Sequence, residues 1–215
     1  MKTRSRKDPI QPENIFLKYT ERKEAIQKRL KEFSAVLPQN YFYELAYCLL
    51  TPQSSARSAA KVIQIFTELD FEHREIDPES ILRNKSHYIR FHHTKAGHLQ
   101  VMKTQFAEIQ KHLQQNFSAE ETREWLVQHV KGLGYKEATH FLRNIGRNGE
   151  LAILDRHILR NLKRYGAIRT IPKTLSPNHY FRIEKKFQQF AQRSGIPIND
   201  LDLLFWSFET GEILK

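Results

Sequence analysis

The 215-residue sequence contains one cysteine, few glycines and prolines, and no long apolar run. Cys48 alone cannot form an internal disulfide, and it excludes a four-cysteine iron–sulfur cluster and a cysteine-based zinc site. No segment approaches the roughly 20 apolar residues that span a bilayer, and the start, MKTRSRKD, lacks the apolar core of a signal peptide. We therefore expect a cytoplasmic protein that has no contact with a membrane.

Acidic residues are in deficit, because 24 Asp and Glu stand against 35 Lys and Arg. The resulting net charge of +11 favours a polyanionic partner, most commonly nucleic acid, although part of such a charge can simply serve solubility. Among the ten histidines, His92 and His93 are adjacent and the other eight show no paired helical spacing beside a carboxylate. We expect no metal site.

Apolar residues recur at helical spacing along most of the chain, and no segment alternates with period two. Helices are predicted over residues 13–33, 41–50, from Ser54 or Ser55 to Leu69, and over 79–83, 88–113, 118–131, 135–147, 156–165, 180–194 and 200–208. Ser118 followed by Glu121 forms a capping box for one helix, and Asp155 can cap another. The sequence thus predicts an all-α protein.

A glycine hairpin, Gly132-Leu133-Gly134, joins two of these predicted helices. Glycine accepts a positive φ, and backbone N–H groups at such a turn, together with the next helix N-terminus, suit a phosphate oxygen. Eight Lys or Arg residues lie from Lys131 to Arg164 against three acids, and Arg156 and Arg160 share one face of their helix. The pattern favours a helix-hairpin-helix that binds a nucleic-acid backbone; an ordinary helical hairpin is the alternative.

Lys136 and Asp155 are the candidate reactive residues. Lys136 falls in the first turn of a helix, where the macrodipole disfavours a cation by roughly 0.3–1 kcal/mol. Such surroundings favour a neutral amine, which is the form that attacks carbon and makes a Schiff base. Asp155 either only caps its helix or also stabilises positive charge on a sugar as a base departs. A solvent-exposed lysine and a plain helix cap remain the alternatives.

Five segments together resemble the helix-hairpin-helix DNA glycosylase superfamily, and within it the archaeal and bacterial 8-oxoguanine DNA glycosylase/AP lyases of the second Ogg class. These segments are GLGYKEATHFLRNIG followed by LAILDRHILRNL, then LLTPQSSARSAAKVI, IRFHHTKAGHL and DLLFWSFETGEILK. The likeness covers most of residues 40–215, and the basic arm before Asp8 has no place in it.

The resemblance implies a role for each of several residues. Lys136 would be the Schiff-base nucleophile, Asp155 the catalytic carboxylate, and Gln53 the residue that fills the hole left by the extruded base. Trp206 and the carboxylate of Lys215 would lie near the pocket for the oxidised base. A core tryptophan and a frayed terminus are the alternatives for these two.

The implied architecture has two helical lobes with a cleft between them. Residues 40–146 would form a central lobe that ends in the hairpin, and 1–39 would pack with a C-terminal lobe of 147–215. Lys136 and Asp155 would then face one another across the cleft, where binding sites commonly lie.

The implied activity is base excision repair of duplex DNA that contains 8-oxoguanine, by a monomer working with the nucleoid. No cofactor is required, although the hairpin carbonyls could hold a monovalent cation. Two other functions stay open: a non-catalytic DNA-binding module, and a glycosylase for another damaged base.

Overall fold

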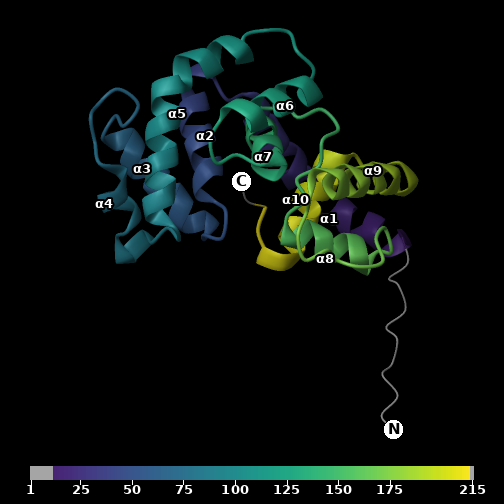
Figure 1. Cartoon of the computed structure of the whole chain (residues 1–215). Helices are drawn as coiled ribbons and strands as arrows, with labels where there is room; N and C mark the ends of the chain where they lie inside the picture. The colour runs from purple at the N-terminus through teal and green to yellow at the C-terminus, as the bar shows by residue number, and fades with distance from the viewer. Residues whose placement is uncertain (1–11, 214–215) are drawn as a thin grey trace. The chain divides into compact units, whose positions relative to one another are not determined.

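The computed structural model describes residues 12–213, with side chains from Ile15 onward. Ten α-helices, two short 3-10 helices and no strand are found within these residues (Figure 1), which confirms the predicted all-α class. No helix in this part of the chain combines the length and apolarity that a membrane span needs.

The described residues form two compact units. We call residues 31–151 the hairpin unit, and residues 12–30 together with 152–213 the terminal unit. The first helix, α1 (Pro12–Ser34), contributes to both, since the division falls between Leu30 and Lys31. Each unit has its own buried core and is described by itself.

In the hairpin unit, α2 is the central helix (Figure 1). The elements of this unit after α1 are η1 (Pro38–Asn40), α2 (Tyr41–Leu50), α3 (Ala56–Glu68), α4 (Pro78–Leu82), η2 (Lys85–His87), α5 (His92–Leu113), α6 (Ala119–His129) and α7 (Tyr135–Asn144). Helix α2 packs against α3, α5 and α7 because eight of its ten residues are buried. This central position accounts for the strongly apolar sequence YFYELAYCLL.

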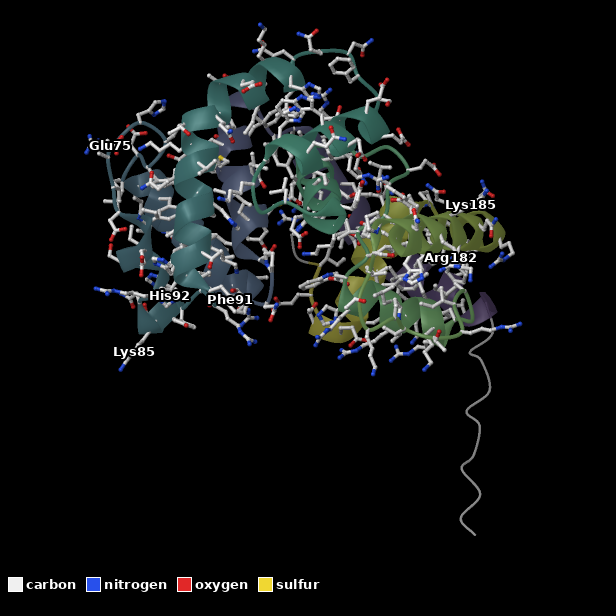
Figure 2. All side chains as sticks on the ribbon, viewed as in Figure 1. Glu75, Lys85, Phe91, His92, Arg182 and Lys185 are labelled. Atoms are coloured by element: carbon white, nitrogen blue, oxygen red, sulfur yellow. The ribbon has the colours of Figure 1, made fainter. Side chains whose placement is uncertain are left out.

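Caps define several helix starts in this unit. The capping box of Ser118 and Glu121 is confirmed at α6, and Ser55 rather than Ser54 caps α3. The predicted start of the long helix at Tyr88 is wrong, because α5 begins at His92. Phe91 before it has a left-handed backbone with φ 59°, which a continuous helix cannot accommodate. Figure 2 labels Phe91 and His92 at this end of α5.

The terminal unit packs α8 (Arg156–Arg164) and α9 (Pro177–Ser194) against α10 (Ile198–Thr210). Phe205 lies at the centre of its core, with ring centroids of Tyr165 and Phe187 at 5.6 and 5.9 Å. Tyr19 of α1 donates a 2.7 Å hydrogen bond to buried Asp200 of α10. This bond attaches the first part of α1 to the unit although the two residues lie 181 positions apart.

Candidate active site

The hairpin between α6 and α7 requires glycine at position 132 for two reasons. Its φ is +93°, and an added Cβ would lie 2.2 Å from Nδ1 of His98. The next residue, Leu133, is buried, and its N–H donates to the carbonyl of Val130 at 3.1 Å. The turn is therefore held by its own backbone hydrogen bond and by the imidazole ring of His98 on α5.

The N-terminus of α7 follows this turn directly. Gly134 is its N-cap and supplies no side-chain hydrogen bond to the first turn. Backbone N–H groups at such an end can donate to an external oxygen, which suits an anion. Lys131 is exposed at the start of the hairpin and adds positive charge.

Lys136 lies in the first turn of α7, and its side chain is 22% exposed. Its Nζ is 3.6 Å from Oε1 of Glu137. A second lysine, Lys95 of α5, is almost fully buried nearby. Burial, and then the positive charge of Lys136, lower the pKa of Lys95 to about 8. The two ammonium groups therefore interact within the hairpin unit.

Gln53 occupies the segment between α2 and α3 in the same unit. It is exposed and has φ 55°, an uncommon conformation for a residue other than glycine. Lys95 donates hydrogen bonds to the carbonyls of Leu50 and Pro52 before it and to Oγ of Ser54 after it. The segment that contains Gln53 is thus held by Lys95, a lysine to which the sequence pattern assigned no role.

Periodicity could have identified Lys95. It occupies the same helical stripe as Leu99, Met102 and Phe106, which are all buried. A lysine in such a stripe is unusual, because buried lysines require partners for their charge.

Asp155 caps α8, as the sequence predicts. Its Oδ1 accepts a 2.8 Å hydrogen bond from the N–H of Ile158, and its Oδ2 accepts a 2.6 Å bond from Nε1 of Trp206. The preceding segment, Leu151 to Leu154, is fully buried. Both oxygens of the carboxylate are therefore held, one by the helix backbone and one by the indole.

The bond to Asp155 gives Trp206 a contact that the sequence analysis missed. No sequence pattern could reveal it, because the two residues are 51 positions apart. The Trp206 ring also meets His157 edge-on, with centroids 5.0 Å apart. The predicted place of Trp206 beside an oxidised base stays a prediction, and Lys215 lies outside the described residues.

Exposed cations surround Asp155 within the terminal unit. A cavity of about 580 Å³ is lined by Asp155, Arg156, Arg160 and Lys173, with Ile171 and Leu175 among its apolar residues. Glu209 lies 3.6 Å from Arg160 and 3.9 Å from Arg164, which orients both guanidinium groups. The arrangement places one fixed carboxylate among side chains suited to phosphate groups.

The two units supply complementary chemistry. The hairpin unit offers an amine at Lys136 beside a turn and helix N-terminus whose N–H groups suit an anion, and the terminal unit offers the oriented carboxylate of Asp155 among cations. Among the described residues, no group of three or more His, Cys, Asp or Glu side chains is arranged to hold a metal ion.

Comparisons with known proteins agree on one family. The family described as 8-oxoguanine DNA glycosylase matches residues 26–196. An 8-oxoguanine DNA glycosylase/AP lyase of Fusobacterium nucleatum is 35% identical over 206 residues, covering 92% of this chain and 94% of the relative. One of Methanocaldococcus jannaschii is 36% identical over 205 residues, covering 93% and 96%.

Solved structures give the same result. The Methanocaldococcus jannaschii 8-oxoguanine glycosylase/lyase, crystallised with a 15mer DNA containing 8-oxoguanine, has a TM-score of 0.83 at 32% identity and covers 94% of this chain and 100% of its own. The 8-oxoguanine DNA glycosylase of Thermotoga maritima has a TM-score of 0.83 at 29% identity, covering 95% and 98%. The chain therefore belongs to the 8-oxoguanine DNA glycosylase family.

Proposed function

We propose that this protein removes 8-oxoguanine from duplex DNA and then cleaves the damaged strand, as a bifunctional glycosylase and lyase of base excision repair. The observation that carries the proposal is the family match, which spans residues 26–196 and so includes both Lys136 and Asp155. The names of the relatives, which combine glycosylase with AP lyase, support both activities.

Lys136 acts as the nucleophile in this proposal. Its neutral Nζ attacks C1′ of the damaged nucleotide, and the bond from C1′ to the base breaks with its electron pair leaving on the base. Loss of a proton from the amine and opening of the sugar ring give an imine between Lys136 and the deoxyribose. Removal of a proton from C2′ then expels the 3′ oxygen and its phosphate, which cuts the strand on the 3′ side.

Asp155 stabilises the positive charge that develops on the sugar while the base departs. Its two hydrogen bonds, from the N–H of Ile158 and from Nε1 of Trp206, support this role because they keep the carboxylate in one orientation. A fixed charge avoids the cost of reorganisation during the reaction.

Backbone contacts to the DNA are assigned to both units. In the hairpin unit, the turn of Gly132, Leu133 and Gly134 meets the phosphates, and Lys131 adds charge. The N–H of Leu133 already donates to Val130, so the N–H groups of the two glycines are the donors to DNA. In the terminal unit, Arg156 and Arg160 meet phosphates. Such contacts position the duplex without reading its sequence. Extrusion of the damaged nucleotide costs roughly a few kcal/mol, and Gln53 enters the space that it leaves.

The remaining assignments concern the base pocket, the oligomeric state, the location and the cofactor. Trp206 lies beside the extruded 8-oxoguanine, and Lys215 supplies its carboxylate there. The protein acts as a monomer on DNA in the cytoplasm with the nucleoid. It needs no cofactor, although the hairpin carbonyls could hold a monovalent cation.

Borohydride trapping tests the proposal directly, because reduction converts the imine into a stable covalent adduct. The wild-type protein is mixed with a duplex carrying one 8-oxoguanine, with an undamaged duplex, and with duplexes carrying an oxidised pyrimidine or an alkylated purine. We expect an adduct only with 8-oxoguanine, and mass spectrometry of its peptides should locate it at Lys136. Tight binding to all duplexes without any adduct would instead indicate a DNA-binding module.

A further inference from the structure

Gln53 has a backbone conformation that needs support. Its φ of 55° lies in the left-handed region, which is unfavourable for a residue with a side chain. The side chain is exposed, so burial of its own atoms does not stabilise this conformation. The support must therefore come from contacts that hold the neighbouring residues of the segment.

Lys95 supplies that support. Its Nζ donates 2.7 Å hydrogen bonds to the carbonyls of Leu50 and Pro52 and a 3.0 Å bond to Oγ of Ser54. All three bonds of the ammonium thus go to the short segment that contains Gln53. Ser54 Oγ also accepts from the N–H of Arg90, which ties the segment to the start of α5.

The burial of Lys95 is difficult to explain by packing alone. The side chain is 5% exposed and lies on the apolar stripe of α5, where methionine would fill a similar volume without a desolvation cost. The charge is also unfavourable beside Lys136, since burial and then that second charge lower the pKa of Lys95. The three hydrogen bonds that its ammonium donates to the Gln53 segment explain why a lysine occupies this position.

We propose that Lys95 is a positioning residue that holds Gln53 in the conformation in which it enters the DNA duplex opposite an extruded nucleotide. The inference deepens the proposed function and rests on it. Lys95 touches neither the base nor the sugar, and it acts only through the Gln53 segment.

Two duplexes separate positioning from a general structural role. One carries 8-oxoguanine opposite cytosine, and the other carries it opposite an abasic analogue, where no partner base remains for Gln53 to contact. Lys95→Met keeps the volume but removes the three donors. We expect single-turnover base release to slow roughly tenfold opposite cytosine and to change by less than about twofold opposite the analogue.

Lys103→Met is the matched control. Lys103 also lies on α5, is 11% exposed, and donates a 2.6 Å bond to a loop carbonyl, that of Arg74. Its loop does not contain Gln53, so base release should stay within about twofold of wild type on both duplexes. Gln53→Ala should reproduce the pattern of Lys95→Met, and the double variant should be no slower than Gln53→Ala alone, because one residue acts through the other.

Equal slowing by Lys95→Met on both duplexes, or no slowing on either, would overturn the inference. If that variant does not fold, Ser54→Ala decides the question, since it keeps the lysine and removes one of its three acceptors. Slowing of roughly threefold only opposite cytosine would support positioning, and any other result would contradict it. Failure of the wild-type protein to release 8-oxoguanine from either duplex would instead refute the proposed function.

Discussion

The hairpin unit and the terminal unit hold their reactive residues in different ways. In the terminal unit both oxygens of Asp155 accept hydrogen bonds of 2.8 Å or less. In the hairpin unit the ion pair of Lys136 with Glu137 spans 3.6 Å, and the lysine is 22% exposed. The difference matches the chemistry that we assign. A carboxylate that stabilises charge benefits from a fixed orientation, whereas a nucleophile must approach a carbon atom and release its proton.

Removal of the Lys136 amine should produce the largest effect. Lys136→Gln should abolish both base release and strand cleavage, because no other residue supplies the imine, while the affinity for lesion DNA stays within about tenfold. Gel assays of cleavage and fluorescence anisotropy measure the two quantities. Lys131→Gln removes an equal charge from the same hairpin and should retain both reactions, with the salt dependence of binding reduced by about one counterion. Persistent strand cleavage by Lys136→Gln would contradict the role of this lysine.

Neutralisation of Asp155 should have the second-largest effect on base release. Asp155→Asn should slow base release by about 10²–10³-fold, because the charge that stabilises the developing cation is lost. Cleavage at a pre-formed abasic site should fall much less, since no base departs there. Asparagine also has one acceptor oxygen instead of two, so it cannot serve both Ile158 and Trp206, and the free energy of unfolding should drop by about 1 kcal/mol. Equal slowing of both reactions would argue against this division of roles.

A change in the hairpin backbone should alter stability and DNA binding together. Gly132→Ala introduces a Cβ at φ +93° that collides with His98. The strain should lower the free energy of unfolding by about 1–2 kcal/mol, and the affinity for DNA should fall about tenfold. Gly166→Ala in the terminal unit has φ +74° but no atom within 4 Å of its Cβ. It should lose stability by strain alone and keep its affinity, as urea unfolding and anisotropy would reveal.

The indole donor of the terminal unit can be removed without removing the ring. Trp206→Phe deletes the 2.6 Å bond to Asp155 and should slow base release about tenfold if that bond orients the carboxylate. Trp125→Phe is the control, because Trp125 lies in the hairpin unit, stacked between His112 and His129. Single-turnover rates of the two variants would be compared, and similar slowing in both would disprove a specific role for Trp206.

The smallest expected effect is on stability alone. It involves His112, which stacks on Trp125. Burial, followed by the charges of His129 and Arg147, lowers the pKa of His112. The unfolded chain therefore takes up this proton first as the pH falls through about 6.5, so stability decreases below that pH. His112→Phe removes this dependence and should reduce the fall in Tm between about pH 7.5 and 5.5 by roughly 1–2 °C. Calorimetry measures it, and unchanged base release would show that the stack is separate from the chemistry.

His73→Gln is a control, because it should change the pH dependence of Tm in the opposite direction. The hydrogen bond that His73 donates to the Asp70 carboxylate raises the pKa of His73, so its contribution favours the folded state at low pH and is lost as the pH rises. Its removal should make the acid-side fall in Tm larger rather than smaller.

Local patterns allowed much of the fold to be predicted. The boundaries of α2 are confirmed as predicted, and the caps at Ser118 and Asp155 are confirmed because a cap depends on residues only three positions apart. The end of α7 was placed three residues too late, at Arg147 instead of Asn144. Its C-terminal end depends on Gly146, whose φ is +69° and whose Cβ would collide with Ser34, more than 100 residues earlier.

The sequence by itself determined the all-α class and the glycine hairpin, because these depend on periodicity and turn chemistry. It offered Lys136 and Asp155 as candidates, and their catalytic roles follow from the resemblance to the glycosylases. Only the tertiary structure revealed the bond from Trp206 to Asp155 and the bonds from Lys95 to the Gln53 segment. Their partners lie 51 and 43 positions apart along the chain. Contacts of that separation arise when packed helices bring distant residues together, and no local pattern encodes them.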